Sequence, residues 1–135
     1  MSTPVLEVNG LTAGYDGAPV IRDVDLTVAE GEVVALLGAN GAGKTTTLKA
    51  ISALLRPMAG TVAFAGSPLD GTPAATRARL GIAHVPAGRG IFSTLTVAEH
   101  LRLAHRQERL DEAAAYRYFP VLSRLKDRTA CPISG

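Results

Sequence analysis

The sequence predicts an α/β fold in which a strand-rich N-terminal part is followed by strands and helices in alternation. Three observations predict it. Residues 6–8 and 24–28 alternate apolar and polar side chains, as half-exposed antiparallel strands do. Residues 33–37 (VVALL) are apolar at every position, which is typical of a strand covered on both faces in a parallel sheet. Apolar residues at helical spacing follow from Lys44 onward.

The composition is that of a globular protein. With 135 residues, 47% of them apolar and 19% charged, the chain is long enough for one domain with a core. The N-terminus, MSTPVLEVNG, lacks the basic and apolar stretches of a signal peptide, and the apolar runs fall far short of the roughly 18 residues of a membrane helix. We therefore expect a cytoplasmic protein. The single cysteine, Cys131, is interpreted as structurally neutral.

The charge is unevenly distributed. The formal net charge is +2, and the second half of the chain, residues 70–135, carries ten basic and six acidic side chains. A basic half could indicate nucleic-acid binding. Because its arginines are spread over predicted helix faces with little aromatic interleaving, we favour a solvated surface and predict no nucleic-acid partner.

The predicted elements follow in order along the first half. The turn at 29–32 ends the second strand, and the helix that begins at Lys44 is expected to reach residue 55, because Pro57 forbids its continuation. A short strand at 61–65 is closed by Gly66. A short helix at 74–80 then precedes a second apolar strand at 81–85.

The rest of the chain is predicted to be helical. Thr96 and Glu99 have the spacing of a capping box, which predicts a helix from residue 97 to about 106. Asp111 could cap a second helix that runs to Tyr118, and Pro120 opens a third through residue 125. We therefore divide the chain into a strand-rich subdomain, about 1–95, and a helical subdomain, about 96–130.

A glycine-rich segment lies between the predicted buried strand and the helix. Residues 38–45 (GANGAGKT) fit the pattern G-x-x-x-x-G-K-[ST] in the strand and helix context that this phosphate-binding loop requires. Backbone N–H groups must approach a polyphosphate closely, and glycines allow both that approach and positive φ angles. The sequence therefore predicts a P-loop that binds ATP with Mg²⁺.

The side chains of the loop have distinct expected roles. Lys44 adds a full positive charge directed at the terminal phosphates, beside the amides at the start of the helix. Thr45 places a hydroxyl on Mg²⁺, and Thr46 is positioned for a further phosphate contact. The loop residues predicted to bind ATP are Asn40, Gly41, Ala42, Gly43, Lys44, Thr45 and Thr46.

Two other interpretations of this segment are an incidental turn and a dinucleotide-binding fold. A glycine-rich turn with an incidental lysine would give the same letters without a function. A dinucleotide-binding fold expects G-x-G-x-x-G and an acidic residue about 20 positions later. The spacing of Gly38 and Gly41 breaks that pattern and residues 58–66 contain no acid, so the dinucleotide fold is set aside.

Beyond the loop, the chain resembles the ATP-binding subunits of ABC transporters. The resemblance is carried by LEVNGL at 6–11, Gly14-Tyr15, VDL at 24–26, GEVVALLG at 31–38 and the P-loop, in that family's order and spacing. It implies an ABC-type P-loop ATPase fold with an N-terminal antiparallel β subdomain, part of a parallel core and a helical subdomain. It also implies that the aromatic ring of Tyr15 stacks on adenine, with Val20 or Ile21 packed nearby; a tyrosine merely at a sheet edge is the alternative.

Residues 85–92 (VPAGRGIF), which lead into LTV at 95–97, look like the Q-loop region of the subgroup that imports branched-chain and related amino acids, or urea. His100 stands where that subgroup has asparagine. The sequence also departs from the subgroup at Ala87, where the family has a glutamine or glutamate that faces Mg²⁺. A methyl group cannot coordinate a metal, so coupling between the nucleotide and the membrane partner is in doubt at this position.

The family's signature motif begins as Ile133-Ser134-Gly135, where the sequence ends. The resemblance implies that Ser134 and Gly135 contact ATP held by a second ATP-binding subunit, and that permease subunits are the membrane partners. The carboxylates that the family uses for Mg²⁺ and for water come later, so we expect no catalytic residues in this chain and no hydrolysis by it alone. The alternatives are a binding module without turnover and, less favoured, a soluble ABC protein of translation or DNA repair.

Overall fold

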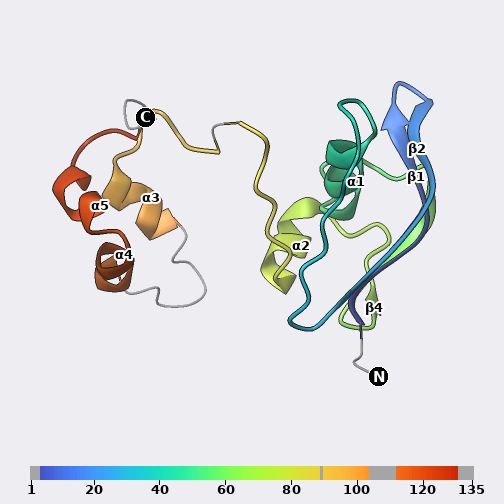
Figure 1. Ribbon diagram of the computed structural model, residues 1–135, viewed down its shortest axis with the longest axis horizontal. Helices are drawn as coiled ribbons and strands as arrows, with labels where there is room; N and C mark the ends of the chain where they lie inside the picture. The colour runs from blue at the N-terminus through green and yellow to red at the C-terminus, as the bar shows by residue number, and fades with distance from the viewer. Residues whose placement is uncertain (1–3, 89, 104–111, 131–135) are drawn as a thin grey trace. The chain divides into compact units, whose positions relative to one another are not determined.

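The computed structural model describes residues 4–88, 90–103 and 112–130 (Figure 1). The chain forms two compact units, residues 1–85 and residues 86–135. We call them the N-terminal and the C-terminal unit and describe each by itself. The division of the chain into subdomains at about residue 95 stays a prediction.

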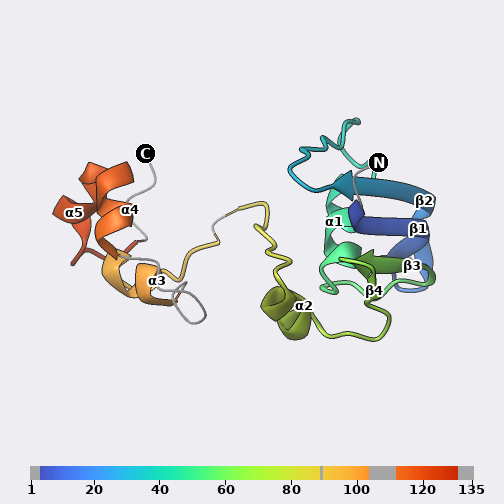
Figure 2. The ribbon, with the colours of Figure 1, turned by 90° about the horizontal axis from the view of Figure 1, so that it is seen from below.

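The N-terminal unit is built on a four-stranded antiparallel sheet, whose strands lie one beside the next in Figure 2. Its strand order is β2-β1-β3-β4, so the first strand lies inside the sheet. The strands are β1 (Pro4–Tyr15), β2 (Ala18–Ala29), β3 (Ala59–Phe64) and β4 (Ser67–Pro68).

The predicted antiparallel pair is confirmed and is longer than expected. Leu6 pairs with Val28 and Val8 with Leu26, and the two strands continue to a two-residue turn at Asp16-Gly17. Both turn residues have positive φ, 51° and 80°, as the twist of a tight hairpin requires. The predicted exit turn at 29–32 is also present, since the N–H of Glu32 donates to the carbonyl of Ala29 at 3.1 Å.

Helix α1 (Lys44–Ile51) packs its buried side against the sheet. It begins where the sequence predicts but ends four residues early, because Ser52 turns its hydroxyl back onto the carbonyl of Leu48 at 2.8 Å and Ala53 adopts a left-handed φ of 58°. The core joins apolar side chains of the sheet, of α1 and of the segment after β4. They are Val8, Leu11, Ala13, Ile21, Ala50, Ile51, Val62 and Leu69.

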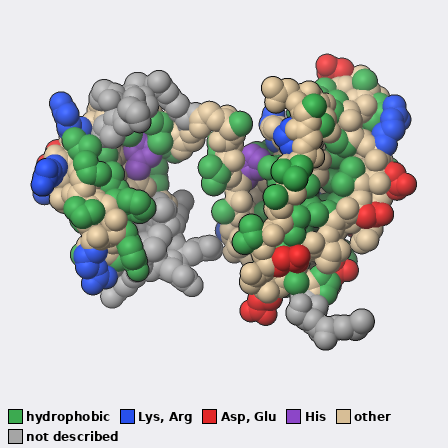
Figure 3. Space-filling model, in the orientation of Figure 1, with side chains coloured by type: hydrophobic (Ala, Val, Ile, Leu, Met, Phe, Trp, Pro, Cys, Tyr) green, Lys and Arg blue, Asp and Glu red, His purple; other side chains and the backbone are tan. Residues whose placement is uncertain are grey.

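Two predicted strands are wrong in this structure. Residues 33–37 and 81–85 form no strand, and no parallel pair occurs among the strands of the described chain. Hydrophobic side chains reach the surface of this unit (Figure 3), and Val33 and Leu37 are 94% and 90% exposed. A parallel strand obtains its hydrogen bonds only from neighbouring strands. The described strands all belong to the antiparallel sheet and leave residues 33–37 without that partner.

Helix α2 (Ala74–Leu80) has the predicted bounds and holds a buried arginine. Arg77 is 3% exposed, and its guanidinium donates to the carbonyls of Thr72 (3.1 Å), Leu69 (2.8 Å) and Ile51 (2.6 Å). Burial lowers the pKa of Arg77, and the charge of Asp70 opposes that shift. The side chain thus ties α2 to the end of α1 and to the loop after β4.

The C-terminal unit contains three short helices, α3 (Val97–Leu103), α4 (Glu112–Tyr118) and α5 (Pro120–Leu125). Helix α4 packs against both others. The predicted starts at residues 97 and 120 are confirmed. The predicted end of the first helix near 106 and the cap at Asp111 lie outside the described residues.

The capping box at the start of α3 is confirmed. The N–H of Thr96 donates to Glu99 Oε2 at 2.8 Å, and the N–H of Glu99 donates to Thr96 Oγ1 at 3.2 Å. The N–H of Thr96, followed by its hydroxyl, lowers the pKa of the Glu99 carboxyl by stabilising its charged form. Residues 126–128 of the same chain also support this helix start, since the N–H groups of Val97 and Ala98 donate to the carbonyls of Arg128 and Lys126.

None of the helices in the described ranges is both long and apolar enough to cross a bilayer.

Candidate functional site

The glycine-rich loop ends on the first residue of α1. Gly41 and Gly43 both have positive φ, 86° and 92°, a region that side chains other than glycine rarely occupy. The N–H of Ala42 donates to the carbonyl of Ala39 at 3.1 Å and makes a tight turn inside the loop. The chain therefore reverses its direction within the loop, and the first turn of α1 follows directly.

Gly43 is required for a second reason, its close approach to the sheet. A Cβ atom at this position would lie 2.3 Å from Cγ2 of Ile21, in the core of β2. Real Cβ atoms do not come so close to other heavy atoms. The absence of a side chain at residue 43 thus lets the start of α1 rest directly on β2.

Lys44 closes the loop on itself. Its ammonium group donates to the carbonyls of Gly38 at 2.6 Å and Ala39 at 2.7 Å. An ammonium group has three N–H donors. Two of them hold the loop, and the third is available to an oxygen atom of a ligand that sits in front of the helix.

A hollow of about 260 Å³ lies at the mouth of the loop. The N–H groups of the first helical turn have no partner within the helix and carry partial positive charge. One ammonium group, two hydroxyls and an amide side chain accompany them, with no carboxylate, so the site favours an anion. The lining residues are Val20, Asn40, Gly41, Gly43, Lys44, Thr45 and Thr46.

The residues of the hollow fit a magnesium–triphosphate. Thr45 is exposed at its edge, where a hydroxyl can serve as a hard oxygen ligand of Mg²⁺. Thr46 also lines it but is only 5% exposed. In the described ranges no group of three or more His, Cys, Asp or Glu residues could hold a metal ion. A metal at this site would therefore need phosphate oxygens and water as further ligands.

Of the residues predicted to contact adenine, some line the hollow and others do not. Val20 lines the hollow and is 46% exposed, whereas Tyr15 lies at the end of β1, 44% exposed, and is not among the lining residues. The Tyr15 ring has Lys49 of α1 beside it, with Nζ at 5.8 Å from the ring centroid. Ile21 is buried beneath Gly43. Base stacking on Tyr15 stays a prediction.

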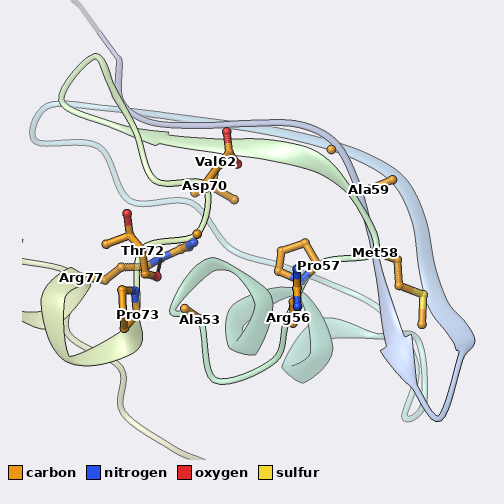
Figure 4. Close-up of a pocket in the computed structure, with 12 residues that line it drawn as sticks. Ala53, Arg56, Pro57, Met58, Ala59, Val62, Asp70, Thr72, Pro73 and Arg77 are labelled. Carbon is orange, nitrogen blue, oxygen red and sulfur yellow. Dashed lines mark hydrogen bonds between the residues drawn. The ribbon is translucent and has the colours of Figure 1, made fainter.

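A larger hollow, about 650 Å³, lies between the end of α1 and the start of α2 (Figure 4). Sequence reasoning missed it, together with Arg77. Its charged residues are Arg56, Asp70 and Arg77, and the guanidinium of Arg77 already donates to four backbone carbonyls. Its lining includes the carboxylate of Asp70, which disfavours an anion, so the smaller hollow is the candidate for a polyphosphate.

The remaining predicted site residues belong to the sequence range of the C-terminal unit, residues 86–135. Ala87 is exposed in a bend of the C-terminal unit. Ser134 and Gly135 lie outside the described residues. Their roles stay predictions.

Comparison with known proteins identifies the family. The family model described as "ABC transporter" matches residues 21–130, which is most of the chain. The branched-chain amino acid transport protein LivG of Salmonella typhimurium is 36% identical over 108 residues, which cover 80% of this chain and 42% of LivG. The probable LivF protein of Archaeoglobus fulgidus is 36% identical over 132 residues, 93% of this chain and 55% of LivF.

Relatives with a different cargo also match. Ribose import ATP-binding protein RbsA 1 of Rubrobacter xylanophilus is 38% identical over 106 residues, 78% of this chain and 21% of that protein. The chain thus spans about half the length, or less, of the curated relatives it matches.

Solved structures agree with the family. The structure of an ATP-binding subunit of an ABC transporter is 36% identical with a TM-score of 0.78, and the match covers 96% of this chain and 56% of that one. An ATP-binding cassette at 23% identity, with a TM-score of 0.77, shares the fold. The predicted fold class, a P-loop ABC ATPase with an antiparallel β subdomain and helices, is confirmed. The chain therefore belongs to the ABC transporter family and carries part of its ATP-binding domain.

Proposed function

We propose that this chain binds Mg²⁺-ATP at residues 38–46 as part of an ABC transporter ATP-binding subunit. One observation carries the proposal: the glycine loop leads into the N-terminus of α1 with Lys44 folded over it. That arrangement puts backbone amides, the helix dipole and one full positive charge around a hollow free of carboxylates. A polyphosphate is the ligand class that all three features recognise.

The cargo that fits best is a branched-chain amino acid or a related small solute. LivG and LivF, both named for branched-chain amino acid transport, support this choice, together with the subgroup-like segment at 85–97. Urea and sugars are the competing cargoes, since a ribose import protein matches as well. Permease subunits and a second ATP-binding subunit would be the partners, and the location would be the inner face of the cell membrane.

A second proposal concerns turnover. We infer that the 135-residue chain alone binds ATP without hydrolysing it. The hollow at the loop has no carboxylate among its lining residues, and Ala87 stands where the family places a glutamine or glutamate. A water molecule that attacks the γ-phosphate needs an oriented acceptor for its proton.

Lys44→Ala tests the binding site. We expect ATP to bind about ten- to a hundredfold more weakly, because a charge-assisted hydrogen bond contributes about 1.5–3 kcal/mol. Titration calorimetry with Mg²⁺-ATP measures the change. Arg79→Ala, which removes an exposed positive charge of α2 outside the hollow, is the control for a general loss of charge.

If both variants weakened the binding of Mg²⁺-ATP equally, the proposal that Lys44 belongs to the binding site would be refuted. A phosphate-release assay on the same samples separates the second proposal from the first. Phosphate release by the unmodified chain that Lys44→Ala abolishes would show turnover and refute binding without hydrolysis, while it would leave the site itself intact.

A further inference from the structure

His100 of α3 joins two backbone groups through its two ring nitrogens. Nδ1 lies 2.8 Å from the carbonyl oxygen of Thr96, and Nε2 lies 2.8 Å from the backbone nitrogen of Phe92. The imidazole and phenyl rings are also neighbours, with centroids 6.0 Å apart and an interplanar angle of 33°. One half-buried side chain thus fastens the segment before the helix to the helix itself.

These two bonds determine where the ring proton sits. A carbonyl oxygen only accepts, so Nδ1 must carry a hydrogen. A backbone N–H only donates, so Nε2 must be unprotonated and accept through its lone pair. The imidazole is therefore neutral with its hydrogen on Nδ1, and each nitrogen has a fixed task.

A second proton would remove one of the bonds. Protonated histidine is a donor at both nitrogens, so Nε2–H and Phe92 N–H would face each other at the distance of a hydrogen bond. The bond to Thr96 would survive, because Nδ1 keeps its hydrogen. Imidazole ordinarily gains its proton between about pH 5 and 8, within the range that cells experience.

The Phe92 bond secures a segment with little other support. Among the described residues of 86–95, the other backbone N–H groups that donate are Gly90, to the carbonyl of Gly88, and Leu95, to the carbonyl of Phe92, and both bonds are local. Leu95 also accepts from Ala130. The link from Phe92 to α3 therefore depends on the imidazole, and the segment it secures contains Ala87.

We propose that His100 is a proton-sensitive positioning residue, which holds the segment around Phe92 against α3 while its ring is neutral and releases that segment when the ring is protonated. The inference concerns the conformation of the C-terminal unit and does not depend on ATP binding.

The charged groups near His100 lie on α3, on α4 and on the segment after α5. Glu99 and Arg102 flank it on α3, and Arg102 pairs with Glu112 of α4 at 3.0 Å. The segment that accepts hydrogen bonds from the start of α3 contains Lys126, Asp127 and Arg128. The described residues of 86–95 have no ionisable side chain. Because Thr96 lowers the pKa of Glu99, that carboxylate keeps its charge throughout the range in which an imidazole titrates.

Nuclear magnetic resonance on the nitrogen-15-labelled 135-residue chain tests the proposal directly. At about pH 7.5 we expect the ring of His100 to carry its hydrogen on Nδ1, the tautomer that the two bonds require. At about pH 5.5 the hydrogen-exchange protection of the Phe92 amide should fall by about tenfold, the equivalent of one hydrogen bond. The amide of Ala98, which donates to Lys126, is the internal control and should keep its protection.

Two variants separate a proton-dependent role from a merely structural one. His100→Gln offers an oxygen acceptor that does not titrate, so protection of the Phe92 amide should be the same at both pH values. His100→Phe keeps a ring beside Phe92 but accepts nothing, so protection should be low at both. The hydrogen on Nε2 at neutral pH would overturn the proposal, and so would titration of His100 without any change at Phe92; both are read from the unmodified chain, whether or not the variants fold.

Discussion

Gly43→Ala is expected to destabilise the N-terminal unit by about 2–5 kcal/mol. Two costs add up. A residue with a Cβ pays about 1–2 kcal/mol in the left-handed region, where Gly43 has a φ of 92°. Its Cβ would also lie 2.3 Å from Ile21 Cγ2, and overpacking of a core typically costs about 1–3 kcal/mol.

Urea denaturation measures this change as a lower midpoint with an unchanged slope. Gly41→Ala is the matched control, since Gly41 has a similar φ of 86° but nothing within 4 Å of its added Cβ. Gly41→Ala should be destabilised only by the cost of the left-handed backbone conformation. If the two variants were equally stable, the close approach of the loop to β2 would be contradicted.

Arg77→Met is expected to cost about 2–4 kcal/mol, since each buried carbonyl left without a donor costs about 1–3 kcal/mol. The carbonyls of Ile51 and Thr72 receive hydrogen bonds from this guanidinium. Methionine fills similar space but donates nothing. The end of α1 and the start of α2 would lose the link between them.

The same denaturation experiment with Arg79→Met supplies the control, because Arg79 lies on the same helix but is exposed. We expect that variant to stay close to the unmodified chain. Arg77→Lys should be intermediate, since one ammonium group cannot replace a planar guanidinium that reaches four carbonyls. Equal midpoints for Arg77→Met and Arg79→Met would refute the structural role of Arg77.

Features set by neighbouring residues could be predicted from the sequence. The capping box of Thr96 and Glu99 is local, and the structure contains both of its hydrogen bonds. The start of α1 at Lys44 and both bounds of α2 follow from the same kind of signal. The antiparallel pair of β1 and β2 was also predicted, although the Asp16-Gly17 turn that joins them was overlooked. An Asp-Gly pair is a strong hairpin signal, so that turn was within reach.

Features that depend on distant partners could not be predicted in this way. Residues 33–37 have the composition of a buried parallel strand, but composition does not supply the neighbouring strands, and Val33 is 94% exposed. Arg77 looks like a solvated arginine in the sequence, because the carbonyls that bind it belong to Ile51, Leu69 and Thr72. The clash behind Gly43 involves Ile21, 22 positions earlier, and is invisible to a motif.

Part of the candidate site could be predicted from the sequence and part could not. Its loop was predicted from eight consecutive residues, 38–45, and Val20 came from the family resemblance. The structure brings Val20 to the hollow and leaves Tyr15 outside its lining. The hydrogen bonds from Lys44 to Gly38 and Ala39 were not anticipated, since a lysine in this motif was expected to face phosphate alone.

We expect the backbone amides at the start of α1 to surround a polyphosphate. Amide chemical shifts of the labelled chain, recorded during addition of Mg²⁺-ATP and separately of Mg²⁺ with inorganic triphosphate, test it most directly. We predict that both ligands move the amides of Gly41, Gly43, Lys44 and Thr45 more than any others. Unchanged amide shifts at these residues, or shifts centred on the hollow beside Arg77, would refute the polyphosphate site at the start of α1.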